Sequence, residues 1–471
     1  MTDTSILNAE AIDDPAFGPA IQLIEAKDYA KVVQLVRSLG ENARAPTLNA
    51  AGVAANVLKA MDLAESFYRR ALAIEPGFVA TYNNLGLFLR TERRVVEAES
   101  VLHAGLRVQP DEPVICMAVA NLLWLQERYV ETEVAFRELI DRHPDDKEAQ
   151  FRLGALLLSL GRFEEGWPLY EARHDPKRPG APERVQFAFP QWRGEPLAGK
   201  SILVWLEQGF GDEIQFSRYF PLLKAAGAAR VTVVCKPALE PLLATIEGVD
   251  RLVPAEGSHS IEDHDYWSFL MSLPGAFGTT LESVPNQVPY IHVPPERRTR
   301  WAGAIPDEGL RVGLVWKGNP FLANDAQRSV HDLATLRPLW DVPGVTFVSL
   351  QKGAGEDEAA SPPADQPMLD IGSKAQDFAD SAAIMDQLDL VIAVDTAAAH
   401  LAGALGKPCF CLIPNEGMDF RWLTERSDSP WYPTMRLFRR GRAQSWDRAV
   451  GELAAALAEF AAASRKGAAA G

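Results

Sequence analysis

The arrangement of apolar and polar residues changes once along the chain, near residue 180. Before that point, apolar residues recur at helical spacing, as in Ala98, Val101, Leu102 and Leu106. After about residue 200, short apolar runs of strand length alternate with helical segments and turns. These runs lie at 201–206, 231–235, 251–253, 310–316, 345–349, 388–394 and 408–413. The first pattern predicts an all-α region, and the second predicts parallel sheets covered by helices on both faces.

The helical region contains an internal repeat. Pro76, Pro110 and Pro144 follow one another at intervals of 34 residues, and within a unit Gly, Ala and Pro are spaced by twelve residues each. This order is present at Gly52, Ala64 and Pro76, and again at Gly86, Ala98 and Pro110. Small residues let two antiparallel helices approach closely, and proline cannot continue the second helix. The spacing therefore predicts stacked helical hairpins.

This order resembles the tetratricopeptide repeat (TPR). Units are expected at about 45–78, 79–112, 113–146 and 147–180, after a degenerate unit at about 11–44. Such repeats stack into a curved solenoid whose concave face binds segments of other proteins. We therefore expect residues 1–180 to bind a protein partner. A merely structural or self-associating solenoid is the alternative.

Two stretches rich in proline divide the rest of the chain. The expected order is a linker at 181–199, a Rossmann-like half at 200–293, a hinge linker at 294–309, a second Rossmann-like half at 310–440, and a C-terminal helix with a tail at 441–471. Open α/β sheets bind ligands beyond the carboxyl ends of their strands. The cleft between the two halves is therefore the expected site.

The first candidate motif follows the first strand. Gly209 and Gly211 allow a close approach of the backbone to a ligand, and Asp212 stands at the start of a helix. A dinucleotide fingerprint would need a third glycine where Ile214 stands, so an NAD site is not expected. Asp212 is a candidate general base toward a hydroxyl. Stabilisation of the helix dipole is its alternative role.

The second candidate motif follows the apolar run at 388–394. Asp395, Thr396 and Ala397 form a turn of small residues that leaves room for a phosphate against free N–H groups, and His400 lies on the first helical turn. A histidine on a helix is ordinarily structural. Its place behind an Asp-Thr turn favours a contact with a phosphate or a sugar.

The third set follows two other strands of the second half. Lys317 at a strand end is a candidate for neutralising a departing phosphate, with Asn319 beside it. Gln351 and Lys352 follow the next strand and have weaker claims. An exposed loop lysine is the alternative interpretation of Lys317.

Charge and composition narrow the function further. With 47 basic and 63 acidic residues the formal net charge is −16, which argues against a nucleic-acid binder. No apolar window is long enough to span a membrane, and residues 1–5 lack the start of a secretory signal, so a cytoplasmic protein is expected. The four cysteines stand in apolar runs and no cluster has zinc-ligand spacing, so we expect no metal.

The Gly-Phe-Gly-Asp turn and the run at 394–406 together resemble the heptosyltransferase-like, family 9-like glycosyltransferases. The resemblance covers about residues 198–440. It implies a GT-B fold, in which two Rossmann-like domains face a cleft, with the acceptor on the side of the first half and the nucleotide-sugar on the side of the second. It also implies inverting transfer without a metal or other cofactor. Repeats in front of such a domain are similar to the layout of O-GlcNAc transferase, and some bacterial members of this fused group modify flagellin.

The resemblance also assigns roles to residues. The family's catalytic aspartate falls on Asp212, its nucleotide contacts fall on Asp395, Thr396 and His400, and Lys317 is the most plausible phosphate-facing lysine. The family usually has glycine after the threonine, where Ala397 stands. A methyl group there narrows the approach to the backbone, so the donor need not be ADP-heptose and need not carry two phosphates.

The sequence thus leads to one hypothesis with two alternatives. The chain is expected to transfer a sugar from a nucleotide-sugar to Ser or Thr of a protein acceptor, with flagellin as a candidate, held by the TPR region. One alternative is transfer to a cell-envelope glycan. The other is a non-catalytic TPR scaffold with a degenerate transferase domain.

Overall fold

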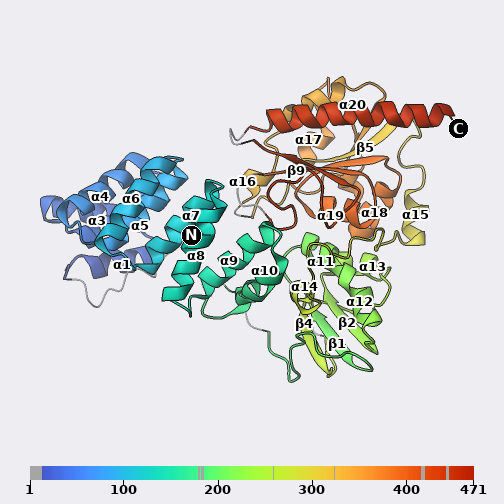
Figure 1. Cartoon of the computed structure of the whole chain (residues 1–471). Coiled ribbons are helices and arrows are strands. Elements are labelled where there is room, and N and C mark those ends of the chain that lie inside the picture. Colours follow the sequence, from blue (N-terminus) through green and yellow to red (C-terminus); the bar gives the residue numbers. More distant parts are fainter. Residues whose placement is uncertain are drawn as a thin grey trace. The chain divides into compact units, whose positions relative to one another are not determined.

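The structure is a computed structural model that describes residues 13–178, 181, 185–257, 259–322, 324–414, 419–441 and 445–470 (Figure 1). The chain divides into two compact units. The first comprises Met1–Leu153 with Lys177–Ala181, and the second comprises Gly154–Pro176 with Pro182–Gly471.

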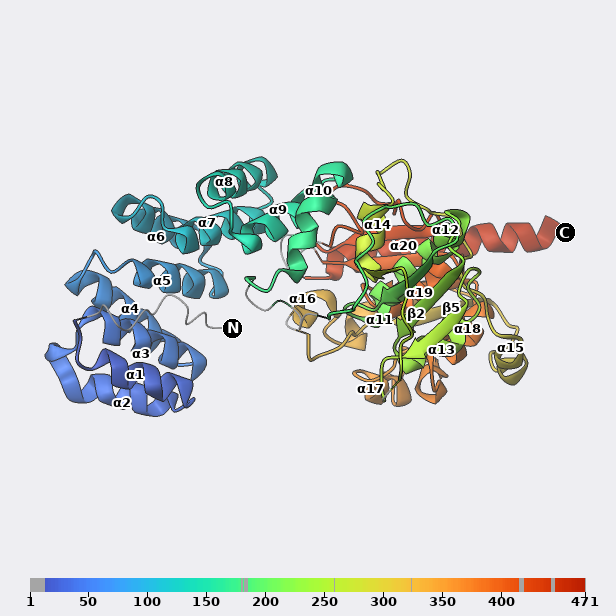
Figure 2. The ribbon, with the colours of Figure 1, turned by 90° about the horizontal axis from the view of Figure 1, so that it is seen from below.

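The first unit is a series of antiparallel helix pairs (Figure 2). Its helices are α1 (Phe17–Glu25), α2 (Tyr29–Leu39), α3 (Ala45–Val57), α4 (Met61–Ile74), α5 (Val79–Thr91), α6 (Val95–Val108), α7 (Pro113–Leu125), α8 (Tyr129–Arg142) and the first part of α9 (Lys147–Ser159). Consecutive pairs pack on one another in chain order. The predicted TPR-like repeats are confirmed.

The residues that define the repeat act as their spacing predicts. A Cβ atom at Gly52 would lie 2.5 Å from the ring of Tyr68, and one at Gly86 would lie 2.5 Å from Leu102, so larger residues would push the two helices of a pair apart. The second helix of each pair ends two residues before the repeated proline, as α4 does before Pro76. The turn inside each pair has a positive φ at the same repeat position, as at Lys59, where the angle is 61°.

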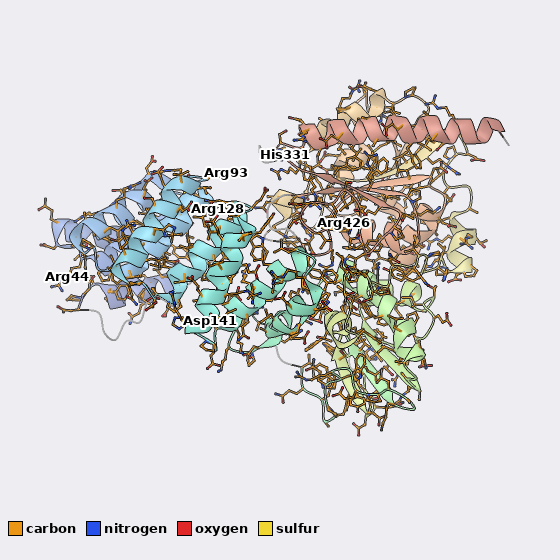
Figure 3. All side chains as sticks on the ribbon, in the orientation of Figure 1. Arg44, Arg93, Arg128, Asp141, His331 and Arg426 are labelled. Carbon is orange, nitrogen blue, oxygen red and sulfur yellow. The ribbon has the colours of Figure 1, made fainter. Side chains whose placement is uncertain are left out.

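Ion pairs link successive repeats along the outside of the solenoid. Arg128, labelled in Figure 3, pairs with Glu131 of its own unit and, at 2.7 Å, with Glu99 of the preceding unit. Arg94 makes the same two kinds of contact one unit earlier. Both arginine side chains are 36% exposed, so solvent screens these pairs and they add little to stability.

The second unit contains two parallel sheets. The first has the order β3-β2-β1-β4, and the second has the order β10-β9-β8-β5-β6-β7. The first sheet consists of β1 (Ser201–Trp205), β2 (Arg230–Cys235), β3 (Arg251–Pro254) and β4 (Tyr266–Phe269). The second consists of β5 (Leu310–Val315), β6 (Val345–Ser349), β7 (Leu369–Asp370), β8 (Leu390–Val394), β9 (Cys409–Ile413) and β10 (Met435–Arg439). The predicted fold class, a helical solenoid followed by two Rossmann-like lobes, is confirmed.

Helices cover both sheets. The first lobe carries α11 (Phe210–Phe216), α12 (Phe220–Ala225), α13 (Glu240–Leu243) and α14 (Leu273–Ala276), and the second carries α15 (Pro295–Trp301), α16 (Asp325–Arg328), α17 (Glu356–Ala360), α18 (Phe378–Asp386), α19 (Ala397–Ala404) and α20 (Asp447–Ala470). In the second lobe α20 lies on one face of the sheet, while α18 and α19 lie on the other (Figure 1). Among the described helices, none has the length and apolar character needed to cross a bilayer.

The structure differs from the sequence prediction at several boundaries. The first unit ends at Leu153 instead of 180, because α10 (Phe163–Tyr170) buries its aromatic side chains in the second unit. The predicted hinge at 294–309 contains α15, and α20 continues through the predicted tail. Strands β4, β7 and β10 have no counterpart in the prediction, since each apolar run is short or interrupted by charged residues. The predicted linker at 181–199 lies partly outside the described residues.

Candidate functional site

The site lies where the two lobes meet within the second unit. In each sheet the strand order reverses direction at one point, between β1 and β4 in the first lobe and between β5 and β8 in the second. Ligands of such sheets bind at these switch points, beyond the carboxyl ends of the strands. Two of the predicted motifs meet at the second switch point, where a Cβ on Gly318 would lie 3.4 Å from the methyl group of Thr396.

Asp212 stands on the first turn of α11, at the first switch point. Its Oδ2 accepts the backbone N–H of Gly209 at 2.7 Å, and Gly209 is the N-cap of the helix. One carboxylate oxygen therefore has the capping role that its position in the sequence allows. The other oxygen points to the second lobe.

The partner of that second oxygen is Arg421, which sequence reasoning missed. Its guanidinium pairs with Asp212 and with Asp419, and it also donates to the side chain of Gln215. The guanidinium stacks 4.8 Å from the ring centre of Phe420. The short run Phe420-Arg421-Trp422, with arginine between two large aromatics, was the signal in the sequence.

Burial dominates the electrostatics of Asp212. Desolvation raises the pKa of its carboxyl above the ordinary value, and the charge of Arg421 and the N–H of Gly209 oppose that rise. A carboxylate with a raised pKa is a better proton acceptor than an exposed aspartate. The group can therefore take a proton from a hydroxyl, provided that the hydroxyl replaces Arg421 at Oδ1.

His400 is buried, not presented to solvent. Its ring stacks on Trp422 with centres 5.3 Å apart, and Nδ1 lies 2.9 Å from the hydroxyl of Tyr432. A Cβ on Gly211 would lie 2.7 Å from Cδ2 of His400, so Gly211 permits the close packing of α11 on α19 across the lobes. Burial lowers the pKa of His400 well below its usual value, so the ring is neutral at pH 7.

Asp395 and Thr396 lie directly at the end of β8. Thr396 is the N-cap of α19, with Ala397 as the first helical residue, and the Thr396 hydroxyl donates to the carbonyl of Val394 at 3.2 Å. Asp395 is buried, and burial together with the nearby charge of Asp419 raises its pKa to about 6.

A small hollow lies beside Asp395. It is lined by Asp395, Ile413, Pro414, Asp419, Trp422 and Arg439. It therefore lies between the end of β8, the end of β9 and the segment that carries Arg421.

The residues that follow β5 and β6 have mainly structural partners. Lys317 pairs with Glu358, whose other oxygen accepts the N–H of Leu333 at 2.7 Å. Gln351 is buried and accepts the N–H of Lys317 at 3.1 Å, while its amide nitrogen donates to the carbonyl of the same residue. Lys352 is exposed and donates to the carbonyl of Ser373 at 2.7 Å.

Asn319 lies on the exposed loop after Lys317, and its side chain accepts the N–H of Phe321 at 3.0 Å. It therefore caps a local turn.

Arg328, at the end of α16, has a side-chain N–H that donates no hydrogen bond to another described residue. Its Nε is buried without a hydrogen-bond partner, and none of the residues that the structure describes forms an ion pair with it. The hydroxyl of the neighbouring Ser329 accepts the N–H of Gly318 at 2.8 Å, and Gly318 lies against Thr396, so Arg328 stands near the second switch point. Because Lys317 is already paired, Arg328 is better suited to bind a phosphate.

The described residues include no cluster of three or more His, Cys, Asp or Glu side chains arranged to hold a metal ion. The chemical groups at the site are a largely buried carboxylate on the first lobe, two guanidinium groups on the second, and the N-terminus of α19. The helix pairs of the first unit and the two parallel sheets of the second give the chain a TPR-like repeat region followed by the architecture of the GT-B fold.

Comparison with known proteins identifies the family. Over 461 residues the chain is 30% identical to protein FlbA of Caulobacter vibrioides, covering 85% of this chain and 76% of FlbA. The chain belongs to the FlbA family. No protein-family model matches it.

Two solved structures overlap with separate parts of the chain. A family 9 glycosyl transferase from Veillonella parvula is 15% identical with a TM-score of 0.40, covering 53% of this chain and 88% of that one. A thermophilic TPR protein from Thermus thermophilus is 22% identical with a TM-score of 0.30, covering 34% and 90%. At these values neither carries a functional argument, so the fold rests on the sheet topology and the family on FlbA.

Proposed function

We propose that the chain is a glycosyltransferase that moves a sugar from a nucleotide-sugar donor to a Ser or Thr hydroxyl of a protein acceptor. The observation that carries this proposal is the position of Asp212. It is a largely buried carboxylate, 15% exposed, with a raised pKa at the switch point of one lobe, and the oxygen that pairs with Arg421 faces the other lobe. A base on one lobe and an anion site on the other suit a reaction between two substrates.

Each group has a role in the proposed reaction. Asp212 takes the proton of the acceptor hydroxyl as the hydroxyl oxygen attacks the anomeric carbon of the donor. The bond from that carbon to the donor phosphate breaks, and the nucleotide leaves with the bonding electrons. Arg328 and the backbone N–H groups at the start of α19 stabilise the negative charge on the departing phosphate. Lys317 pairs with Glu358, which also accepts the N–H of Leu333, and so anchors the segment after β5.

The nucleotide of the donor is to be identified by experiment. Ala397 stands at the start of α19, so a phosphate there meets a methyl group where a glycine would leave the backbone bare. We expect a nucleotide-sugar other than ADP-heptose, bound without a metal ion.

The acceptor assignment rests on the repeats. A solenoid of helix pairs offers an extended surface of the kind that holds protein segments, and flagellin is the first acceptor to test. A cell-envelope glycan is the second candidate acceptor, and it would leave the repeats free to recruit an assembly partner.

The first experiment tests the base. Purified full-length protein is screened by thermal shift against UDP, CMP, ADP and GDP and their sugars, and transfer is then measured as a mass increase of the acceptor. Replacing Asp212 with Asn should lower turnover by at least about 100-fold, the usual contribution of a general base. The matched control is Asp141→Asn on the exposed surface of α8, labelled in Figure 3, which should leave turnover unchanged. Wild-type turnover in Asp212→Asn, with the fold intact, would remove the base assignment.

The second experiment separates the acceptors. Because residues 154–176 belong to the second unit, a deletion of the repeats should end at residue 146, before α9. A protein-directed enzyme should lose acceptor modification and keep hydrolysis of the donor, whereas a glycan-directed enzyme should keep both. Failure of the wild-type protein to bind any nucleotide would favour a non-catalytic scaffold.

A further inference from the structure

The last segment of the repeat region is built into the transferase unit. Residues 163–174, which comprise α10 and the 3-10 turn Glu171–His174, occupy the place of a final repeat helix in the 34-residue spacing, yet they pack within the second unit. On the side of the first lobe, the indole N–H of Trp167 donates to the carbonyl of Thr279 at 3.0 Å.

The same segment also contacts the second lobe. The ring of Phe163 lies 6.0 Å from that of Trp431, and the rings of Trp167 and Tyr170 lie 5.5 Å and 5.6 Å from that of Phe420. Phe420 is adjacent to Arg421, the partner of Asp212. Segment 163–174 therefore bridges the two lobes beside the candidate site.

The strongest polar contact of the segment is between Arg173 and Glu207. The two side chains are 4% and 6% exposed, and the guanidinium donates to both carboxylate oxygens, at 3.0 Å and 3.2 Å. It also donates to the hydroxyl of Ser272 at 2.8 Å, and Glu207 accepts the N–H of Met271 at 2.8 Å. His174 completes the arrangement, with its Nε2 2.7 Å from Glu207 and its ring stacked on Phe269.

Glu207 lies immediately before the turn that carries Asp212. Burial alone would raise the pKa of Glu207, but Arg173 and His174 lower it to about 2, so the carboxylate stays charged and bound. Gly209, two residues further along, donates the N–H that Asp212 accepts. Arg173 thus holds Glu207, the backbone leads from Glu207 through Gln208 to Gly209, and Gly209 donates to the candidate base.

We propose that Arg173, on segment 163–174, is a positioning residue for Asp212 that acts through the turn at 208–212. The proposal rests on the proposed function. Arg173 holds Glu207, Glu207 fixes the start of the turn, and the turn keeps the N–H of Gly209 on Asp212. A shift of the turn removes that N–H, which stabilises the charged form of the base.

Hydrogen exchange tests the positioning without any substrate. In full-length Arg173→Met, amides of residues 208–212 should exchange at least about tenfold faster than in the wild type, the effect of losing one charge-assisted hydrogen bond. Amides of α19 should not change. The matched control is Arg448→Met, which breaks an exposed pair with Glu452 on α20 and should leave both regions as they are. Unchanged exchange at 208–212 would overturn the proposal.

The pH profile tests the consequence for the reaction. In Arg173→Met the acid limb of transfer should move to higher pH, because Asp212 without the N–H of Gly209 holds its proton more tightly. Arg173→Lys keeps a positive charge beside Glu207 and should restore part of the profile, whereas Glu207→Gln should shift it in the same direction as Arg173→Met. A purely structural role would lower the rate at every pH by the same factor, which counts against the proposal.

The two hypotheses fail in different ways. If the wild-type protein transfers no sugar, the proposed function fails, and the exchange experiment still decides whether Arg173 positions the turn. If Arg173→Met does not fold, Arg173→Lys and Glu207→Gln are measured alone, and normal exchange at 208–212 in both would overturn the positioning role.

Discussion

The ion pair between Arg421 and Asp212 provides the sharpest test of the site. It joins residues that are 209 positions apart and belong to different lobes, and the side chains are 6% and 15% exposed. Removing one partner of such a buried pair leaves an uncompensated charge, at a cost of about 3–5 kcal/mol. We therefore expect Arg421→Met to lower the free energy of unfolding of the second unit by about that amount at pH 7.

A double-mutant cycle isolates the pair. Asp212→Asn removes the charge that Arg421→Met leaves behind, so the double variant should be more stable than Arg421→Met, with a coupling of about 3 kcal/mol. Urea unfolding followed by tryptophan fluorescence suits this measurement, because all tryptophans except Trp124 lie in the second unit. The control is Arg436→Met, whose exposed pair with Glu459 should contribute no more than about 1 kcal/mol.

The stability loss caused by Arg421→Met should depend on pH in one direction. The pKa of Asp212 is raised in the folded protein, and loss of Arg421 raises it further. A carboxyl with a raised folded-state pKa contributes stability below its unfolded pKa and loses that contribution as the pH rises through the folded value. The part of the Arg421→Met penalty that comes from Asp212 should therefore be full at neutral pH and be lost as Asp212 takes up a proton at lower pH, while the loss of the contacts with Asp419 and Gln215 remains. Additive losses in the cycle at neutral pH, or a coupling that does not fall as the pH is lowered, would refute the ion pair.

Three further changes have distinct expected outcomes. Asp395→Asn should stabilise the protein by about 3 kcal/mol at pH 8 and not at pH 4, as measured by urea titration. The reason is that burial raises the pKa of Asp395 to about 6 and disfavours the charged carboxylate present at pH 8. Equal stability of variant and wild type at pH 8 would contradict this. Gly154→Ala should destabilise the protein by about 1–3 kcal/mol in thermal melts, since the new Cβ would lie 2.6 Å from the backbone nitrogen of Tyr170. The control Gly18→Ala places its Cβ where no atom lies within 4 Å, so it should not destabilise the protein in the same melts. Arg328→Met should weaken nucleotide binding at least about tenfold, as measured by calorimetry, and should weaken it more than Lys317→Met does. A larger effect of Lys317→Met would show that Lys317 binds the phosphate.

The repeats and the strands were predictable because their physical causes are local. Gly52 and Gly86 determine how closely a helix pair packs, and the prolines mark where the pair ends, so a spacing of 34 residues suffices to place each hairpin. The apolar runs fixed most strands in the same way. Parallel strands present their carboxyl ends at one edge, and in the structure the turns after the neighbouring strands β5 and β8 lie together, with Gly318 against Thr396.

The partners of the candidate residues depend on tertiary structure. Arg421 stands in a segment with no periodic pattern, and only the packing of the two lobes brings it to Asp212. The sequence shows only that Lys317 and Arg328 both carry a positive charge. In the structure Glu358 lies beside Lys317, so Lys317 is the one that is paired.

The sequence by itself determined the order of the parts: a helical repeat, then two parallel α/β lobes with small-residue turns at the ends of their strands. These features follow from spacing along the chain and from backbone preferences that act over a few residues. The tertiary structure alone decided that residues 163–174, which keep the spacing of the repeats, pack within the second unit against both lobes, where Arg173 contacts Glu207. Burial and ion pairing depend on which surfaces pack together, and the pattern of residues along the sequence does not specify that packing.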